Sequence, residues 1–511
     1  MASRTPLEVE LKLLLLSNEI AALEQHPALQ EPLAASPELC EEHTVYFDTA
    51  DLRLARKGLS LRIRRHGNRL TQTLKSSSDG GAVAAARGEW EWPVDQDVPD
   101  LARLANTPFG TEIAAEAGCG LQPVFETDIR RSVRSLRLAG NTVVEVAIDQ
   151  GHVAAGPAMQ EIRELELELK SGIPGPLYRL ALALHSDIPF TIGAESKAQR
   201  GYRLRTGEAP QATEGAVPKL AGACPITEAV RQIVGAELGH FLANQPAAAA
   251  GAVEGVHQMR VGIRRLRTAL ALFAKYLEPV AARRFEAELK RLGNVFGAAR
   301  DWDVFCTQTL REAAGDAAMK VWVELLQPAA EARRQIAHRR VADEIGHRAL
   351  AALVLGMAAW LEPDEAATAG LGDNRRQRRL KKHAPILLDR MDRRVAKRGG
   401  HLGRRSSEEL HDFRKSLKKL RYSADYLAAP YPSRSVKRYQ KCAKRLLKLL
   451  GEGNDAAMAI TLSEQLDAGQ SSDLVPAIGA LNRWAEERRA KSLRQLPKAW
   501  LRFNDTPLFW H

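Results

Sequence analysis

The sequence predicts an α+β fold in which an antiparallel β barrel occupies residues 1–206 and an all-α domain follows. Three observations support this prediction. Apolar and polar residues alternate with a period of two through much of residues 45–204. Beyond residue 222 the apolar spacing changes to three and four, which is typical of helices. Within that helical half a motif recurs at a shift of 154 residues, which indicates a duplicated unit.

The first strand is predicted at residues 7–13 and has one apolar face and one charged face. The charged face carries Glu8, Glu10 and Lys12. A half-buried strand with a wet outer face would give the same pattern. The pattern recurs near residue 164, where leucines alternate with Glu164, Glu166 and Glu168. Two acidic rows meeting inside a closed sheet would form a site for hard divalent cations, which take oxygen ligands.

Further strands show the same two faces. Apolar residues alternate with ionised or polar ones at 59–64 and 70–75, on either side of a Gly67-Asn68 turn, and again at 89–92 and 144–149. The ionised groups are of both signs. With these faces turned inward, the fold is an antiparallel barrel with a polar lumen, and helices such as one around residues 177–184 cover its apolar outside.

Residues 207–222 have the composition of a linker, rich in Gly, Ala and Pro. The predicted domains are therefore 1–206 and 223–505. In the second, His257-x-x-Arg260 matches His411-x-x-Arg414, and the same shift carries Asp301 onto Asp455. The helical domain is therefore predicted to contain two copies of a several-helix unit.

Charge is divided unevenly between the two domains. Residues 1–206 carry 23 Lys and Arg against 28 Asp and Glu, whereas the remainder carries 51 against 34. The basic half is the one expected to meet a large anion. There is no apolar run near the roughly 18 residues that span a bilayer, and no signal-peptide pattern. The five scattered cysteines form no CxxC pair. A cytoplasmic protein without a membrane partner is expected.

The repeated motif places a basic stripe on a helix in each copy. The first stripe is His257, Arg260, Arg264 and Arg267, and the second is His411, Arg414, Lys418 and Arg421. A solvated face is the simpler interpretation, but like charges on adjacent turns repel without partners, and the stripe appears twice. A polyanion between the copies would relieve this repulsion. Neighbouring arginines disfavour metal binding by the histidines. Nucleic acid is an unlikely partner because no stacking aromatics are interleaved with the basic residues.

The predicted lumen combines acids and bases in a way that suits triphosphate hydrolysis. Lysine and arginine bind phosphate oxygens, and carboxylates hold the divalent metal that hydrolysis needs. The basic lumen residues are Lys12, Arg62, Arg64 and Lys75, and the predicted metal ligands are Glu8, Glu10, Glu166 and Glu168. Lys12, with Glu8 and Glu10, is predicted to be catalytic. No P-loop, nucleophile elbow or kinase motif competes for the assignment.

Five segments together resemble the CYTH family of triphosphate tunnel metalloenzymes over about residues 5–206. They are Glu8-x-Glu10-x-Lys12, Tyr46-Phe47-Asp48-Thr49, Leu61-Arg62-Ile63-Arg64, Glu164-Leu-Glu166-Leu-Glu168-Leu and Ser196-Lys197-Ala-Gln-Arg200-Gly201-Tyr202. The two His-x-x-Arg motifs and Arg300-Asp301 resemble the CHAD domain, the conserved histidine α-helical domain, over about residues 222–500. The fused order is similar to bacterial CYTH-CHAD proteins, several of which are taken to be inorganic triphosphatases.

The resemblance implies an eight-stranded tunnel, Mg²⁺ or Mn²⁺ on the glutamate rows, and inorganic triphosphate held by basic residues. It adds Arg131, Lys197 and Arg200 as substrate ligands, although alternation alone does not separate Arg131 from Arg130. It also implies that the helical domain binds long-chain polyphosphate, with a location in the cytoplasm at polyphosphate granules. Lys418 replaces an arginine in the second copy, so its phosphate contacts are expected to be less bidentate.

The predicted function is metal-dependent hydrolysis of inorganic triphosphate to phosphate and pyrophosphate, with polyphosphate binding by the helical domain. Two alternatives remain. One is a tunnel enzyme that uses a nucleotide or thiamine triphosphate, such as a class IV adenylate cyclase. The other is a non-catalytic polyphosphate-binding protein, which the two acidic rows disfavour because a pure anion binder gains nothing from carboxylates in its cavity.

Overall fold

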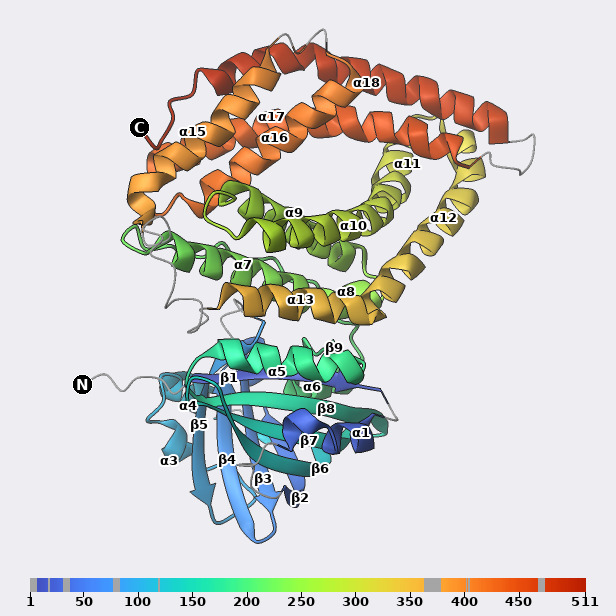
Figure 1. The fold of residues 1–511 in the computed structure, drawn as a ribbon. Coiled ribbons are helices and arrows are strands. Elements are labelled where there is room, and N and C mark those ends of the chain that lie inside the picture. The colour runs from blue at the N-terminus through green and yellow to red at the C-terminus, as the bar shows by residue number, and fades with distance from the viewer. Residues whose placement is uncertain are drawn as a thin grey trace. The chain divides into compact units, whose positions relative to one another are not determined.

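The computed structural model describes residues 7–16, 19–30, 37–76, 83–117, 120–362, 378–400, 402, 405–466 and 474–511. They form two compact units (Figure 1). The first unit holds the N-terminal sheet together with the later helices α8 (Gln245–Ala249) and α13 (Arg348–Leu361). The second unit holds most of the remaining helices of the C-terminal half.

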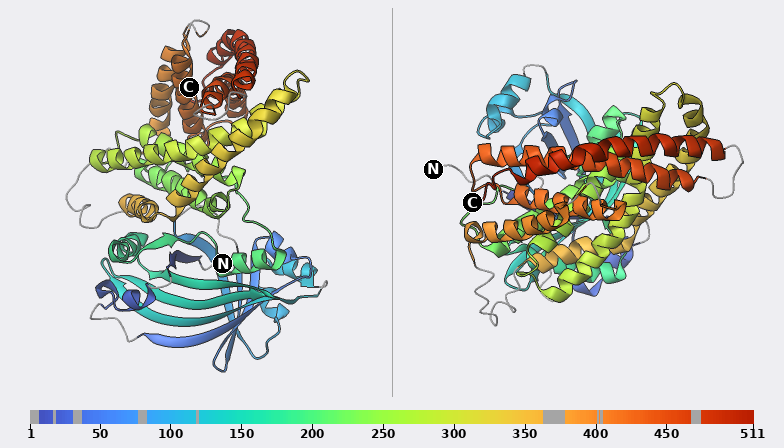
Figure 2. Two further views of the ribbon diagram at one scale, coloured as in Figure 1. Left: turned by 90° about the vertical axis from the view of Figure 1, so that its right-hand side faces the viewer. Right: turned by 90° about the horizontal axis from the view of Figure 1, so that it is seen from above.

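The first unit is built on one antiparallel sheet of nine strands, one more than the predicted eight. The strand order is β5-β4-β3-β2-β6-β7-β8-β1-β9, and β1 also pairs with β5, so that eight strands form a ring. The long strands curve around its interior (Figure 2). The bounds are β1 Leu7–Leu15, β2 Glu38–Asp48, β3 Leu59–His66, β4 Arg69–Ser76, β5 Ala85–Val94, β6 Gln122–Leu138, β7 Thr142–Ala155, β8 Ala158–Ser171 and β9 Phe190–Ile192.

Strand β3 shows how the sequence pattern sets the two faces of the sheet. Leu59, Leu61 and Ile63 are buried in an outer cluster with residues of β2, β4 and three short helices, α2 (Arg53–Arg56), α3 (Leu101–Leu104) and α4 (Gly110–Ala117). Arg62 and Arg64 alternate with them and therefore face the interior. Helix α5 (Pro174–Asp187), which contains the helix predicted around residues 177–184, contacts β8 on the outside.

Two tight turns hold long strands together where the sequence places Gly and Asn. Gly67 joins β3 to β4 and has φ 57°. Gly140 and Asn141 join β6 to β7 with φ 68° and 53°. Glycine, and to a lesser degree asparagine, tolerates this left-handed region, so these residues fix the pairing of their strands.

The helical unit contains the predicted duplication. Helices α7 and α15 begin 154 residues apart, and so do α9 and α16, α10 and α17, and α12 and α18. The bounds are α7 Ile226–Ala243, α15 Leu380–Gly399, α9 Val253–Leu272, α16 Ser407–Tyr426, α10 Pro279–Val304, α17 Ser433–Glu464, α12 Lys320–Gly346 and α18 Leu474–Asn504. Four N-termini that coincide at one shift indicate one duplicated unit. The motif helices α9 and α16 contact each other.

The predicted linker, residues 207–222, has neither helix nor strand at 208–221. The domain bounds themselves stay predictions, because the first unit also holds α8 and α13. Helix α13 packs on α5, where Arg348 donates hydrogen bonds to the carbonyl oxygens of His185 and Ser186 at 2.8 and 3.0 Å. Among the described helices none alone has the length and apolar composition to cross a bilayer, and only the bent pair α12–α13 meets that test when taken together.

Candidate functional site

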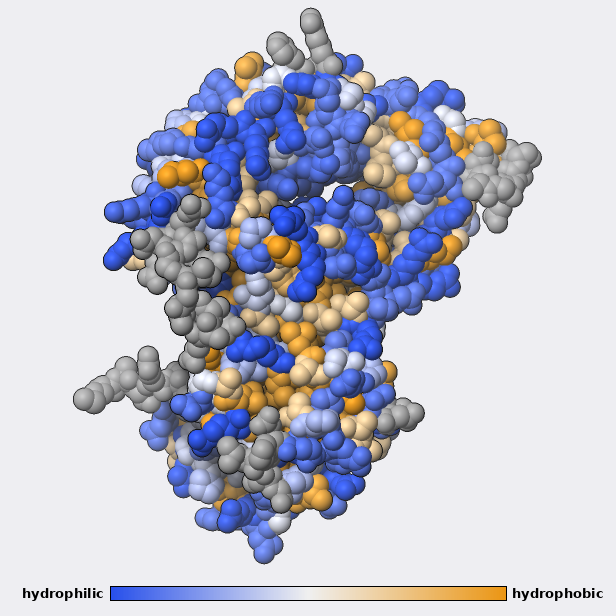
Figure 3. All heavy atoms as spheres, viewed as in Figure 1, coloured by the Kyte–Doolittle hydropathy of each residue, from blue (hydrophilic) through white to orange (hydrophobic). Residues whose placement is uncertain are grey.

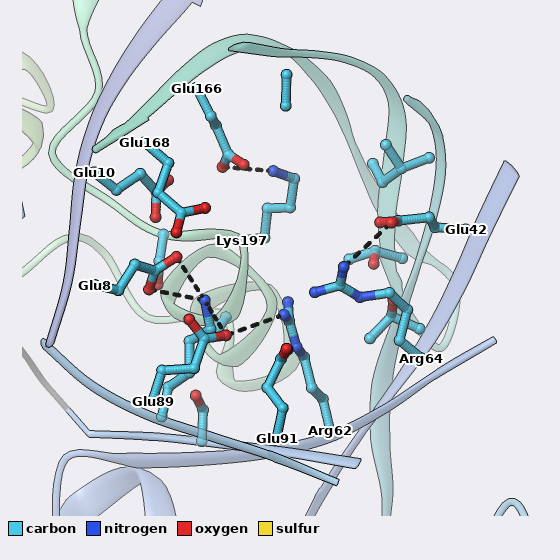
Figure 4. A pocket seen from close by; sticks show the side chains of 18 of the residues that line it. Glu8, Glu10, Glu42, Arg62, Arg64, Glu89, Glu91, Glu166, Glu168 and Lys197 are labelled. Atoms are coloured by element: carbon cyan, nitrogen blue, oxygen red, sulfur yellow. Dashed lines mark hydrogen bonds and ion pairs between the residues drawn. The ribbon is translucent and has the colours of Figure 1, made fainter. Parts of the chain in front are cut away.

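The ring of strands encloses a cavity of about 650 Å³ with charged walls (Figure 4). The lining residues come from all eight ring strands and from the start of helix α6 (Lys197–Thr206). The carboxylates in the wall are Glu8, Glu10, Glu42, Glu89, Glu91, Glu145, Glu166 and Glu168. The cations are Lys12, Arg62, Arg64, Lys75, Arg131, Lys170 and Lys197.

Ten of the eleven residues predicted to act in the tunnel line this cavity, so the predicted inward faces are confirmed. Arg131 is among them, whereas its neighbour Arg130 is exposed on the other face of β6. Arg200 is the exception. It is buried, does not line the cavity, and contacts the carboxylate of Glu164 instead. The roles of these residues stay predictions.

Helix α6 places Lys197 at one end of the cavity. The helix begins with a capping box, in which the Ser196 hydroxyl accepts from the Gln199 amide at 3.2 Å and the Gln199 side chain accepts from the Ser196 amide at 2.8 Å. Tyr202, farther along α6, packs edge-on against Phe125 of β6, with ring centroids 4.9 Å apart. The capped and packed helix therefore holds Lys197 in a fixed position.

Lys12 and Lys197 share carboxylate partners at this end. The Nζ of Lys12 lies 3.2 Å from Oε1 of Glu164 and also contacts Glu166. The Nζ of Lys197 lies 2.8 Å from Oε1 of Glu166 and 2.6 Å from Oδ2 of Asp149. Burial alone would raise the pKa of Glu166, but the charges of the two lysines outweigh it and hold this pKa well below its usual range.

Arg131 completes the same cluster. Its Nε and Nη2 donate to the two carboxylate oxygens of Asp149 at 2.7 and 2.6 Å, and Nη2 also donates to Glu166 at 2.9 Å. Such a bidentate pair is strong and fixes the guanidinium plane. Asp149 and Glu164 are fully buried, and Arg200 contacts Glu164. Four cations therefore surround these three carboxylates, whose negative charge is fully compensated in this part of the wall.

Negative charge is in excess where β1, β7 and β8 meet. Glu168 lies directly across from Glu10 on β1 and from Glu145 on β7, and like charges in such positions repel. Burial raises the pKa of Glu168, and the charges of Glu8 and Glu145 add to this, despite an ion pair with Lys170 at 2.7 Å. A cation would relieve the repulsion.

Lys75 of β4 forms ion pairs with a glutamate of β1 and a glutamate of β5. Its Nζ lies 3.0 Å from Oε2 of Glu8 and 2.8 Å from Oε1 of Glu89. Burial nevertheless raises the pKa of Glu89, and the charge of Glu8 adds to the effect. The lysine therefore compensates only part of the negative charge around it.

Positive charge is in excess on the arginine wall formed by β3. Arg64 Nη1 lies 3.2 Å from Glu42, yet the charge of Arg62 and then burial lower the pKa of Arg64. Burial alone would raise the pKa of Tyr46, but the charge of Arg62 outweighs it and lowers that pKa. Figure 4 shows both guanidinium groups and their glutamate neighbours directed into the cavity. This wall is suited to phosphate oxygens.

Two overlapping sets of carboxylates could hold a hard divalent cation. Asp149, Glu164 and Glu166 each offer an oxygen within 4.8 Å of the others, but lysine and arginine side chains already contact them. Of the predicted ligands, Glu8, Glu10 and Glu168 lie on the strands where negative charge is in excess, whereas Glu166 belongs to both sets and contacts Lys12, Lys197 and Arg131. An all-oxygen donor set of either kind fits a hard divalent cation such as Mg²⁺ or Mn²⁺.

Sequence reasoning missed several ionisable groups of the site. Asp149, Glu145, Glu89 and Glu91 stand on faces whose alternation was visible, so the same rule could have selected them. Glu42 lies in a run of four polar residues at 41–44, where alternation gives no signal. Glu164 stands in the same alternating row as Glu166 and Glu168, but its full burial and its contacts with Lys12, Lys197 and Arg200 were not predicted.

The two predicted basic stripes lie close together in the helical unit. Arg264 of α9 donates from Nε to the Tyr422 hydroxyl of α16 at 3.0 Å. The Tyr422 ring is buried beneath guanidinium groups, with Arg421 at 4.4 Å and Arg264 at 5.4 Å. In Figure 3 the helical unit is hollowed between α9–α10 and α16–α17, with a mostly hydrophilic rim. The contact between Arg264 and Tyr422 therefore brings the two stripes together where α9 meets α16.

The stripes are partly buried rather than freely solvated. Arg260 Nη1 lies 2.8 Å from Asp301 of α10, and Arg267 Nη2 lies 2.8 Å from Glu286 of the same helix. Arg414, the counterpart of Arg260, has a buried Nε without a hydrogen-bond partner in the described part of the chain. The expectation of a basic face directed away from the helix core is confirmed, and some of its cations have acidic partners.

Two titratable members of the stripes show how much positive charge is uncompensated. Burial, followed by the charges of Arg264 and Arg414, lowers the pKa of Lys418 to about 6. Burial, followed by the charge of Arg300, lowers the pKa of His257 to about 4. A bound anion would oppose the effect of the neighbouring charges on both groups, whereas a bound metal cation would add to it. The arrangement therefore favours an anionic ligand over a metal ion.

Two family models match the chain side by side. Residues 6–202 match the CYTH domain, and residues 232–464 match the CHAD domain. The CYTH match contains every predicted tunnel residue, and the CHAD match contains both basic stripes.

Individual proteins match parts of the chain. An inorganic triphosphatase of Haemophilus influenzae is 33% identical over 160 residues, which is 31% of this chain and 44% of that relative, so the match spans less than half of its length. An uncharacterized protein of Mycobacterium tuberculosis is 27% identical over 446 residues, 81% of this chain and 80% of that protein. The crystal structure of the CHAD domain from the plant Ricinus communis is 24% identical, covers 57% of this chain and 96% of that one, and has a TM-score of 0.46.

Proposed function

We propose that this chain, a CYTH domain followed by a CHAD domain, hydrolyses inorganic triphosphate to phosphate and pyrophosphate in its tunnel and binds polyphosphate on its helical domain. The division of the tunnel wall into an acid-rich part and an arginine wall carries the proposal. A triphosphate with its divalent cation requires both parts at once. The similarity of the first domain to an inorganic triphosphatase supports the same substrate class.

The phosphate oxygens are proposed to bind the cations of the cavity wall. Arg62 and Arg64 are the main candidates, because both guanidinium groups point into the cavity (Figure 4) and the charge of Arg62 lowers the pKa of Arg64. The remaining proposed ligands are Lys75, Arg131 and Lys197. Arg200 is proposed to act from outside the cavity, by holding Glu164 against Lys12 and Lys197.

Glu8, Glu10, Glu166 and Glu168 are proposed to hold Mg²⁺ or Mn²⁺. When bound, a divalent cation held by these carboxylates would supply neutralisation of charge on the transferred phosphoryl group and orientation of water. Because Glu10 and Glu168 are cross-strand partners and both line the cavity, the ring places their side chains next to each other on its inner face. The protein's own contribution is thus to place the carboxylates opposite the arginine wall.

Lys12 is proposed to act as a fixed positive charge. Burial alone would lower its pKa, but the charges of Glu10, Glu164 and Glu166 outweigh this and raise the pKa above its usual value. A lysine with a raised pKa stays protonated at neutral pH and is a poor general base. Its proposed role is to stabilise negative charge that develops on the reacting phosphate oxygens.

Polyphosphate is proposed to bind between the two basic stripes of the helical domain. The closeness of the two stripes at Arg264 and Tyr422 and the lowered pKa values of Lys418 and His257 support an anionic ligand. Each bound phosphate would compensate charge that burial now leaves uncompensated. Tyr422 is buried beneath arginines and unavailable for stacking on a base, which favours polyphosphate over nucleic acid.

Phosphate release tests the tunnel proposal. Tripolyphosphate, ATP, thiamine triphosphate and long-chain polyphosphate are compared with and without EDTA, and tripolyphosphate should be the best substrate and EDTA should abolish turnover. Glu8→Gln and Glu166→Gln should lower the rate by orders of magnitude in a folded protein, whereas Glu41→Gln, on the exposed face of β2, should not. Full turnover in EDTA would exclude the metal-dependent mechanism, and a preference for ATP would favour the nucleotide-using alternative.

A binding assay tests the proposal for the helical domain. Alanine at Arg260, Arg264 and Arg267 should weaken polyphosphate binding to the full chain and flatten its salt dependence, because fewer counterions are released. The matching triple change in the second stripe should do the same to a smaller degree. Unchanged affinity and salt slope in both variants would contradict the proposal.

A further inference from the structure

Helix α17 carries a row of exposed lysines that the proposed polyphosphate site does not yet include. The lysine row consists of Lys437, Lys441, Lys444 and Lys448, all exposed. With about 100° per residue on a helix, the four side chains fall within a sector of roughly 60°. No Asp or Glu occurs from Ser433 to Gly451. The helix therefore presents a strip of like charge without acidic residues of its own.

The row has little compensation from elsewhere in the fold. Lys448 lies 3.9 Å from Glu452, and no other ion pair of the row occurs within the part of the chain that the structure describes. Like charges three and four residues apart on a helix repel and destabilise it. A bound polyanion would turn this cost into a favourable interaction.

The first repeat shows that the fold does not require this charge. Helix α10 is the counterpart of α17, and the positions that match the lysine row are Arg283, Ala287, Lys290 and Asn294. Two of these four are uncharged. Arg291 on α10 is moreover paired with Glu344 at 2.6 Å. Since the same structural position tolerates neutral residues, the lysine row is a property of the second copy and not of the helix's place in the bundle.

The row ends at Lys448, about one helical turn from the point where α17 meets the second basic stripe. On α17, Gly451 faces Arg414 of that stripe so closely that a Cβ atom there would lie 3.5 Å from its guanidinium group. Gln440 of α17 donates to Asp425 of α16 at 2.9 Å, so the two helices lie side by side along the row. With an advance of about 100° per residue, the lysine row lies on the same side of α17 as Asp455, and this side is next to the face of α17 that meets α16. A polyphosphate chain that extends from the second stripe along α17 would therefore meet the lysines.

We propose that the lysine row is a second subsite for the same polyphosphate chain, which binds the phosphate units that extend beyond the two stripes. The inference rests on the proposed polyphosphate binding and deepens it, because it makes affinity depend on chain length. Lysine is a strongly hydrated point charge that suits a flexible, repeating anion without bidentate geometry. Tyr439, the aromatic residue of this part of α17, is buried, so the row offers phosphate contacts and no stacking surface.

The test neutralises the row in the full chain and compares two chain lengths. The four lysines are changed to glutamine, which has a similar helix propensity, and thermal melting confirms folding. Binding of a short oligophosphate and of long-chain polyphosphate is measured against salt. The matched control neutralises four exposed cations of α18 on the side away from α17, namely Lys491, Arg494, Lys498 and Arg502.

The variant should lose affinity for the long chain while its affinity for the short one changes little. Loss of four phosphate contacts should also lower the slope of log K against log salt by about 3, taking the value of roughly 0.7 per contact known for single-stranded nucleic acid. Wild-type affinity and slope for the long chain would overturn the inference, as would an equal loss in the α18 control. A wild-type chain that binds neither length would overturn the proposed function itself. Tighter binding of single-stranded RNA than of polyphosphate through the row would assign it to nucleic acid.

Discussion

Affinity for polyphosphate should fall as the pH rises above about 6, because Lys418 is neutral in the free protein and charged in the proposed complex. Burial and the positive charges of Arg264, Arg414 and Arg260 lower its pKa, while Asp455 of α17 opposes them. A polyanion among these groups favours the ammonium form. Binding should therefore take up a proton at neutral pH.

The size of the effect follows from the lowered pKa of about 6. Half of the Lys418 side chains are protonated at pH 6, but only about 1% at pH 8. If the complex keeps this lysine charged across that range, affinity should fall roughly 50-fold between pH 6 and pH 8, which corresponds to about 2.3 kcal/mol. His257, whose pKa is lowered to about 4, is neutral in the free protein at both values.

Calorimetry in buffers of different ionisation enthalpy measures the protons taken up on binding. The wild type should take up close to one proton at pH 7.5. Lys418→Arg keeps the charge at every pH, since an arginine is effectively never deprotonated. This variant should take up fewer protons and lose most of the pH dependence. Wild-type binding without proton uptake, or the same uptake in Lys418→Arg, would refute the reasoning.

The folding stability of the ligand-free protein should rise with pH, whereas its affinity for polyphosphate falls. The unfolded chain keeps Lys418 protonated up to about pH 10.4, whereas the folded protein releases this proton above about pH 6. Between these values the unfolded state binds more protons, so the contribution of Lys418 to stability rises with pH. Lys418→Met should therefore raise the melting temperature of the free protein most at the acidic end of this window, while it weakens polyphosphate binding.

Three further predictions concern the first domain. Arg131→Ala should lower kcat/KM for tripolyphosphate by about 100-fold, since a contact to developing charge is lost, whereas Arg130→Ala on the opposite face should leave turnover unchanged. Asp48→Ala should lower the free energy of unfolding by about 3 kcal/mol, measured by urea titration, because three backbone N–H groups lose their acceptor. Gly201→Ala should cost about 2 kcal/mol, measured in the same way, because its Cβ would lie 2.1 Å from the buried Phe125 ring.

The inward faces of the tunnel could be predicted because a strand allows only two directions for its side chains. At β3 the buried leucines fix the outer face, and Arg62 and Arg64 must then point inward. Helical periodicity likewise gave the basic stripes, and the repeat of 154 residues gave the second copy. Local patterns were sufficient wherever one face is apolar and the other is charged.

The partners of the inward residues could not be predicted, because alternation says nothing about which strands become neighbours. Glu164 and Arg200 meet only after β8 and α6 are assembled, so Arg200 was assigned to substrate although it contacts Glu164 from outside the cavity. The surplus of negative charge at Glu168 depends on β1 and β7 lying on either side of β8. The ninth strand is a run of three residues, too short for a periodic signal.

The two copies of the helical unit differ in their basic residues. This difference indicates that they would bind an anion in different ways. In the second copy an arginine of the stripe is replaced by Lys418, and Asn454 stands where the first copy has Arg300. Asn454 pairs with His411 at 2.9 Å, whereas the charge of Arg300 lowers the pKa of His257. The second stripe thus holds less permanent charge, and its neighbour α17 gains the lysine row. Compared with the first copy, the second copy carries less positive charge on its partly buried stripe, where burial disfavours the charged form of a lysine. It carries more on the exposed lysine row, where the lysines only repel one another. A chain held at its centre by arginine and along its length by lysine would be bound firmly at one point and loosely beyond it.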